Sequence, residues 1–295
     1  MTQHRYRSIR GLVWGAFLLC VFVLLPFGST HAAADDAPWE PSVSFGILSH
    51  VQYVKGDARN SFPPRTDFAS QVDDRNIVVI PAIPIDFQLL APAIDAIPGA
   101  PRLHLSAGVQ FPLDNDQTLA RQGTIPNPVI LPPTPESPVG EDGISGQGTL
   151  FEAEFNVAWR LGLGLQFEMP VQDRRVFIQG SLDYLGQSVS LEGEVVHVTG
   201  LGDGGRSPFL VQELHTRETH AQHSLGPRLA IETHVGRAGP IGFSAFAEAS
   251  ALFLVAGDSQ ETTARDATDS AEFDYDAEPW IIQAGVGIRL RWLGD

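Results

Sequence analysis

Three groups of residues in this sequence could do chemistry. His104 and Ser106 are two positions apart, a spacing that puts a base and a hydroxyl nucleophile on one face of a strand. A histidine segment, with ligands that suit zinc or nickel, contains Glu213, His215, Glu218, His220 and His223. An acidic run that could attract calcium contains Asp258, Glu261, Asp266, Asp269, Asp274, Asp276 and Glu278.

Neither possible metal-binding segment has the ordered spacing of a known motif. The histidine segment is typical of a solvated hairpin stem, and the acidic run lacks the Asp/Asn-Gly order of a calcium loop. We therefore predict no metal site and no cofactor. The sequence contains no P-loop and no G-x-S-x-G motif, and its G-x-G-x-x-G match at 200–205 lies within the predicted long link over 192–218 and not directly after a predicted strand, so nucleotide and hydrolase chemistry have no support.

The elements that must position these residues are strands, because apolar and polar side chains alternate with period two. The longest run sets Phe151 and Trp159 on one side and Arg160 on the other, whereas a helical period would mix the two sets. In the fifth run the alternation slips near Gly186, which suggests a bulge. Eight strands are predicted, over 43–53, 77–89, 103–111, 151–168, 176–184, 222–235, 243–253 and 280–292.

The links between these strands alternate in length. Short links follow the second, fourth and sixth strands, whereas long polar links occupy roughly 55–75, 114–146, 192–218 and 257–278. Short turns at one end and long loops at the other are typical of an outer-membrane barrel. Because a closed barrel leaves no unpaired edge in lipid, the predicted fold is an all-β, eight-stranded antiparallel up-and-down transmembrane β-barrel with long extracellular loops.

The last strand ends with Ile288, Leu290 and Trp292 in step. On this ending and the strand count, residues 35–295 resemble the eight-stranded outer-membrane barrels of the OmpA and OmpX type. The resemblance implies surrounding outer-membrane lipid and lipopolysaccharide, and recognition of the C-terminal strand by the barrel-assembly machinery. One departure is that three residues follow Trp292, where the family usually places the aromatic residue last. Residues 224–229 are similar, more weakly, to Legionella-type pore-forming outer-membrane proteins.

Aromatic residues occur at both ends of the predicted strands. Trp292 lies at the expected periplasmic end, while Tyr53 and Trp280 lie near the outer ends of their strands. These are the two heights at which membrane barrels carry aromatic girdles, so the three residues are predicted to face the membrane interfaces.

The polar faces of the strands place charged side chains inside the predicted barrel. A buried charge without a partner costs several kcal/mol, so we expect the acids to pair with arginines across the lumen. The predicted lumen network contains Asp86, Arg102, Glu152, Glu154, Arg160, Glu168, Asp183, Arg228, Glu232, Glu248, Arg289 and Arg291. An eight-stranded interior is about wide enough for side chains to fill, so a plugged lumen is expected, with a narrow gated ion path as the alternative.

Three functions follow from this fold. The first is a structural or surface-interaction role, and the second is a small pore or channel through the lumen. The third is lipid modification, because lipid A deacylases of this architecture use a His and a Ser two positions apart that face lipid. Strand phase points His104 and Ser106 into the lumen instead, so we predict no catalytic residues and no enzyme. The ligand of the loops does not follow from the fold.

The first 34 residues have the organisation of a secretory signal peptide. A basic start leads into an apolar stretch over 11–27, and small residues follow at 32–34. We predict cleavage there and export of residues 35–295 to the outer membrane of a Gram-negative bacterium. The single cysteine, Cys20, leaves with the signal. A formal net charge of -16 with one lysine, Lys55, excludes phosphate-backbone binding, so no nucleic-acid partner is expected.

Overall fold

The structure is a computed structural model of the 295-residue chain and describes residues 39–61, 71–122, 145–171, 174–200, 209–266 and 269–293. The predicted signal peptide lies outside the described residues. No helix among the described residues is long and apolar enough to cross a membrane. The strands are β1 (Glu40–Ser61), β2 (Gln71–Ala93), β3 (Arg102–Pro112), β4 (Asp116–Gln122), β5 (Ser145–Phe155), β6 (Ala158–Val171), β7 (Arg174–Gly200), β8 (Phe209–Ala238), β9 (Ile241–Ala256), β10 (Ser259–Arg265) and β11 (Ser270–Trp292).

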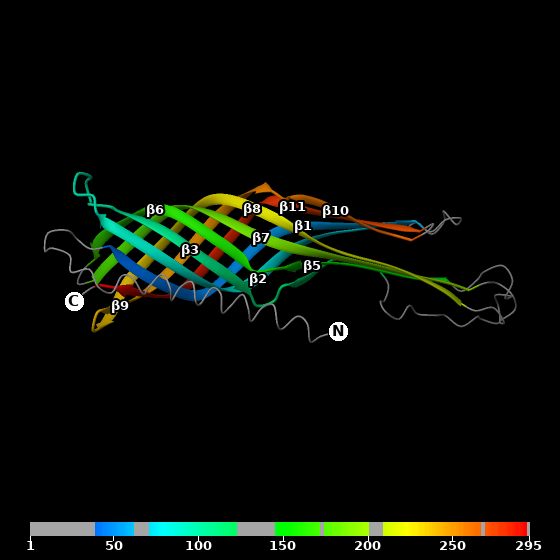
Figure 1. Ribbon diagram of the computed structural model, residues 1–295, viewed down its shortest axis with the longest axis horizontal. Coiled ribbons are helices and arrows are strands. Elements are labelled where there is room, and N and C mark those ends of the chain that lie inside the picture. The colour runs from blue at the N-terminus through cyan, green and yellow to red at the C-terminus, as the bar shows by residue number, and fades with distance from the viewer. Residues whose placement is uncertain are drawn as a thin grey trace.

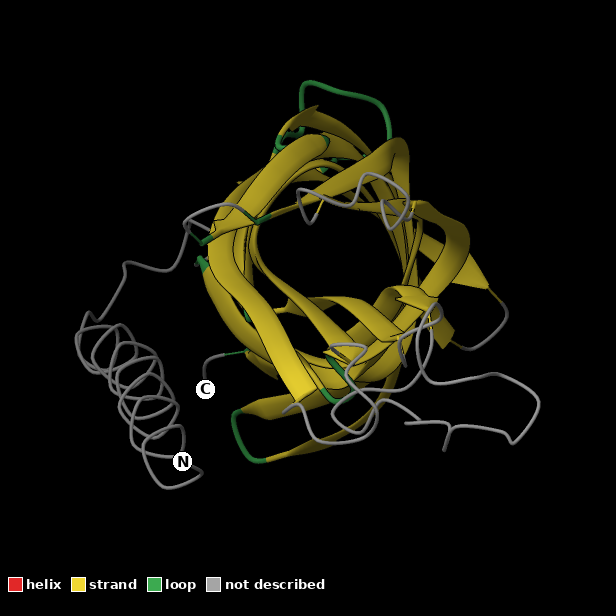
Figure 2. Ribbon diagram, turned by 90° about the vertical axis from the view of Figure 1, so that its right-hand side faces the viewer, coloured by secondary structure: helices red, strands yellow, loops and turns green. Residues whose placement is uncertain are grey.

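Eight of these strands form a closed ring, which Figure 2 shows end-on. The antiparallel pairs run β1–β2–β3–β6–β7–β8–β9–β11 and return to β1. The predicted eight-stranded antiparallel barrel is therefore confirmed. The shear of a barrel is the number of residues by which a path of paired residues is displaced after one circuit of the strands. A path that starts at His50 of β1 and crosses to Gln283 of β11 passes through every strand of the ring and returns to β1 at Glu40. Glu40 comes ten residues before His50, so the shear is 10. Such a shear tilts the strands around the barrel axis, as Figure 1 shows.

The short links lie where they were predicted, but the described residues of the predicted long links are mostly strand. β2 and β3 are joined by residues 94–101, and β8 and β9 by Gly239 and Pro240, where Gly239 has a φ of 59°. At the other end β7 has 27 residues and β8 has 30, and their register is continuous from Val176 to Gly200. A spanning strand needs only about 9–11 residues. The chain therefore continues well beyond the ring, toward the right of Figure 1.

Beyond the ring the strands separate into two sheets, which together we call the extension (54–61, 71–78, 116–122, 145–155, 186–200, 209–222, 259–265 and 270–277). One sheet has the order β2–β1–β11–β10, and the other has the order β8–β7–β5–β4. Side chains join the sheets at their edges: the Asn76 amide donates to the carbonyls of Thr118 and Leu119, and the hydroxyls of Thr216 and Thr262 are 3.0 Å apart. The extension is thus a small β-sandwich continuous with the barrel.

The apolar core of the chain lies between these two sheets. Phe151 of β5 and Phe273 of β11 are fully buried, with ring centroids 5.3 Å apart. Gly193 of β7 is packed under the Phe273 ring, since a Cβ placed on it would come within 2.5 Å of that ring. Leu119, Leu191, Val195, Leu214 and Tyr275 belong to the same buried cluster. The extension therefore has an apolar interior and a polar exterior, as a soluble sandwich has.

The ring has the opposite polarity. Its exterior carries exposed apolar side chains on every strand, while its interior carries charged and amide side chains. Along β7 the inward positions change from Gln179 and Asp183 to Leu185, Val189 and Leu191 with no register shift. The predicted bulge near Gly186 is therefore wrong. The alternation inverts there because the strand passes from an apolar to a polar surrounding, and this inversion also made the long strands resemble loops.

Candidate functional site

The lumen of the ring contains two groups of ion pairs. The first, the Arg160 cluster, consists of Asp86, Arg160, Asp183, Arg228 and Glu248, all of them buried. Arg160 donates to Asp86 at 2.6 Å and to Glu248 at 3.0 Å. Arg228 donates to the other oxygen of Glu248 at 2.9 Å, and its Nε lies 2.8 Å from Asp183. Two arginines are thus held by three carboxylates, and each of the five residues comes from a different strand: β2, β6, β7, β8 or β9.

The second group, the Glu232 cluster, lies nearer the short-turn end. Arg291 forms a two-point contact with Glu232, at 2.7 Å to each carboxylate oxygen, and Arg289 binds Glu232 at 2.6 Å. Gln166 accepts from Arg291 at 2.9 Å and from Gln179 at 2.8 Å. Two arginines with one carboxylate offset the surplus acid of the Arg160 cluster, so the two clusters together are neutral.

Arg102 lies at the short-turn end of the lumen and pairs with Glu40 at 2.6 Å. Glu40 was missed by sequence reasoning because it comes before the predicted first strand. Gln166 and Gln179 share the inward phase with the charged residues, so the same alternation could have identified them.

Three acids of the predicted lumen network belong to neither cluster. Glu152 accepts from the Thr118 hydroxyl on the outside of the extension, and Glu154 pairs with Arg217 on the same surface. Their placement in the lumen is wrong because Asn156 and Val157 interrupt the strand and shift its phase between β5 and β6. Glu168 keeps the inward phase at the short-turn end, where it lines a small pocket with Arg102 and Gln166, but it is half exposed and its ion-pair partner is Arg175, at 3.5 Å.

His104 and Ser106 both point inward, but they do not form a nucleophile and base pair. Neither ring nitrogen of the fully buried His104 has a hydrogen-bond partner among the described residues. Ser106 accepts from Arg228 instead, at 3.4 Å. A serine nucleophile needs a hydrogen-bonded base, and this geometry does not supply one.

The aromatic residues predicted at the interfaces lie on the outside of the barrel. Tyr53, Trp280 and Trp292 are each about half exposed. Trp280 packs edge-on against Phe253, with ring centroids 5.2 Å apart. A further aromatic pair lies on the opposite wall, where Trp159 is 4.9 Å from Tyr184.

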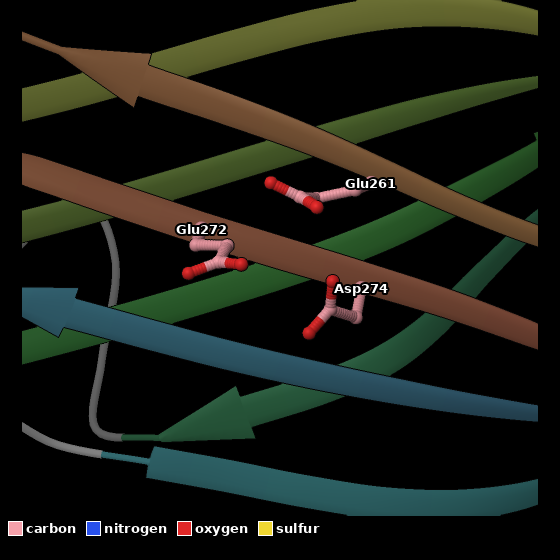
Figure 3. Close-up of side chains that lie close together, drawn as sticks. All are labelled: Glu261, Glu272 and Asp274. Carbon is pink, nitrogen blue, oxygen red and sulfur yellow. The ribbon is translucent and has the colours of Figure 1, made fainter.

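The two possible metal-binding segments behave differently in the fold. The histidine segment lies along β8, where its members have separate partners: His215 pairs with Glu192, and the Tyr184 hydroxyl is 2.6 Å from Nδ1 of His223. Glu261 and Asp274 of the acidic run, together with Glu272, which was not singled out from the sequence, offer carboxylates that lie within 4.8 Å of one another. Figure 3 shows them on the adjacent strands β10 and β11.

These carboxylates lie on the outer face of the extension. Partial burial raises the pKa of Asp274, the Arg59 guanidinium at 3.4 Å lowers it, and Glu272, Asp57 and Asp276 raise it. The result is a pKa above the ordinary aspartate value.

The raised pKa gives a prediction for the pH dependence of folding. The folded state binds the Asp274 proton more tightly than the unfolded state, so this contribution is present at low pH and is lost as pH rises through the folded pKa. Asp274→Asn should therefore stabilise the extension at neutral pH, by a few tenths of a kcal/mol for so exposed a group, and flatten its pH profile. Urea unfolding at several pH values tests this, and Arg59→Met should steepen the profile. An Asn variant with an unchanged profile contradicts the assignment.

No protein-family model matches the chain, and no curated protein matches its sequence. Among solved structures it is similar to Neisserial surface protein A, at 7% identity and a TM-score of 0.31 over 83% of this chain and 97% of that chain. It is similar to the outer membrane protease OmpT from Escherichia coli at 10% identity and a TM-score of 0.21, over 90% and 99% of the two chains. It is also similar to Ail, the attachment invasion locus protein of Yersinia pestis, at 9% identity and a TM-score of 0.22, over 84% of this chain and 98% of that chain. At such scores the barrel assignment rests on the strand pairing of the chain itself.

Proposed function

We propose that the protein is an integral outer-membrane β-barrel with a structural or surface-interaction role and a lumen closed to ions. The apolar exterior of the ring supports insertion into a bilayer, because large apolar side chains exposed on every strand of a closed barrel are stable in hydrocarbon. Outer-membrane lipid and lipopolysaccharide are then its direct surroundings. The resemblance of β11 to terminal barrel strands supports recognition by the barrel-assembly machinery, and export by a cleaved signal peptide remains part of the proposal.

The observation that carries the closed lumen is its filling at two levels. Arginine and carboxylate pairs cross the ring, and the Phe151 and Phe273 core lies above them between the two sheets. An ion would have to break several buried charge pairs and then pass an apolar core, and both steps are costly. This favours the structural role over a pore.

The extension supports the surface role. It projects from one end of the barrel, toward the right of Figure 1. Its outer faces are polar, with acidic residues such as Glu192, Glu261 and Asp276. A non-enzymatic role is supported by His104 and Ser106, which point into the lumen and form no hydrogen bond with each other, since Ser106 accepts from Arg228.

Single-channel recording in planar bilayers tests the proposal. Protein whose folding is verified by heat-modifiable migration on a detergent gel should give no conductance steps. Steps from the folded protein would favour the alternative, a small pore through the lumen. Recovery of the unmodified chain from the soluble periplasm would contradict membrane insertion itself.

A further inference from the structure

An apolar groove of about 530 Å³ crosses the outer wall of the ring over β2, β3, β6, β7 and β8. Its floor is at Ala107, whose cross-strand neighbours are Phe87 and Leu161. A methyl group between two large side chains leaves a depression, and Leu89, Leu105 and Leu182 extend its walls. Its volume lies within the ~300–1,000 Å³ of ordinary ligand sites.

The groove has a polar group at one end. Tyr184 lines it, and the Tyr184 hydroxyl is 2.6 Å from Nδ1 of His223 on β8. Trp159 packs against Tyr184 and covers Gly186, where a Cβ would come within 2.6 Å of the indole. Beyond His223 the same strand continues into the extension with outward polar residues such as Arg217. Ser106 also lines the groove, but its hydroxyl accepts from Arg228 inside the lumen, so the side-chain polar group at the groove is that of Tyr184, toward the extension.

We propose that this groove binds one acyl chain of lipopolysaccharide, with the polar part of that lipid beside Tyr184 and His223. An acyl chain attached to a polar group matches the distribution of apolar and polar side chains, because the chain fills the depression over Ala107 and the tyrosine and histidine offer hydrogen bonds at its end. The polar end faces the extension, which on the proposed orientation is the outer leaflet. The inference rests on the proposed membrane insertion and adds a defined lipid site to it.

The groove differs from the rest of the apolar exterior. On β9 the outward residues Ala245, Ala247 and Ala249 are all small, so a substitution at Ala247 enlarges a side chain on the lipid face without filling the groove. Ala247→Phe is therefore the matched control for Ala107→Phe, since both place the same ring on the outside of the barrel.

The experiment uses the full-length mature protein folded into phospholipid vesicles that contain lipopolysaccharide with a photoactivatable acyl chain. Mapping of the crosslinks by mass spectrometry should find them concentrated on the segments around Ala107 and Leu161. Ala107→Phe should reduce this yield about tenfold, because small steric changes in an apolar pocket alter binding by about that factor. Ala247→Phe should leave the yield unchanged. Tyr184→Phe keeps the shape of the groove and should lower its preference for lipopolysaccharide over phospholipid.

Several outcomes overturn the inference. Crosslinks distributed evenly around the barrel, or an Ala107→Phe variant with an unchanged yield, would remove the site while leaving membrane insertion intact. Equal labelling of the groove by a photoactivatable phospholipid in the presence of lipopolysaccharide would overturn the assignment of its occupant. Absence of crosslinks at any position, in protein that is heat-modifiable, would contradict the membrane proposal as well.

Discussion

Replacement of Arg160 by methionine should destabilise the barrel by about 3–5 kcal/mol, the cost of breaking a buried charge pair by removing one partner. Arg160 is 2% exposed and contacts Asp86, Glu248 and, at 3.7 Å, Asp183. Its removal leaves three carboxylates, of which Arg228 pairs with Asp183 and Glu248. Urea unfolding in lipid vesicles measures the loss.

Two further variants make this result specific. Arg217→Met removes an arginine that also contacts two carboxylates, Glu154 and Glu192, but on the partly exposed surface of the extension. It should cost less than about 1 kcal/mol. The double variant Arg160→Met with Asp86→Leu restores the native charge of the cluster and should recover most of the loss, since apolar replacements of buried pairs are often neutral. Equal losses for Arg160→Met and Arg217→Met would indicate that water fills the lumen.

The ring was predictable from the sequence because a barrel wall between lipid and a polar lumen imposes strict alternation. Asp86, Arg160, Asp183 and Arg228 all follow the inward phase that the alternation assigns to them. Their partners were not predictable, because the pairing depends on shear. A shear of 10 places Arg160 on β6 beside Glu248 on β9, and hydropathy contains no information about this offset.

The extension was not predictable in the same way, because its polarity is inverted. On β7 the inversion appears as a slip at Gly186 and was interpreted as a bulge, although the backbone register is unbroken. At Asn156 and Val157 the opposite happened. Here the strand itself is interrupted, which shifts the phase of the side chains, and the change from apolar to polar surroundings falls at the same place. The two effects cancel in the hydropathy pattern, so Phe155 and Trp159 share an apparent face although Phe155 points inward and Trp159 outward. A hydropathy pattern alone cannot separate a change of phase from a change of surroundings.

Replacement of Phe273 by alanine should destabilise the extension by about 3–5 kcal/mol, the usual cost of removing a buried phenylalanine ring. Phe273 is fully buried against Phe151 and Gly193, between the two sheets. The ring of strands is filled by charge pairs instead, so the loss should concentrate in the extension. Limited proteolysis should then cleave the extension faster, while the heat-modifiable mobility of the barrel is retained. Phe253→Ala, on the outer surface, is the control with the same change of side chain.

A paired substitution at Gly193 tests whether the packing of this core is responsible. Gly193→Ala adds a methyl group where a Cβ comes within 2.5 Å of the Phe273 ring, so the ring must shift, and this overpacking should cost about 1–3 kcal/mol. In the Phe273→Ala background that ring is gone, and the same methyl group enters the cavity left behind. Gly193→Ala should therefore be much less costly in that background, because directly contacting residues are energetically coupled. If the losses in the free energy of unfolding are instead additive in the double variant, the methyl group added at position 193 does not contact the Phe273 ring. The sheets of the extension would then be held together by other contacts.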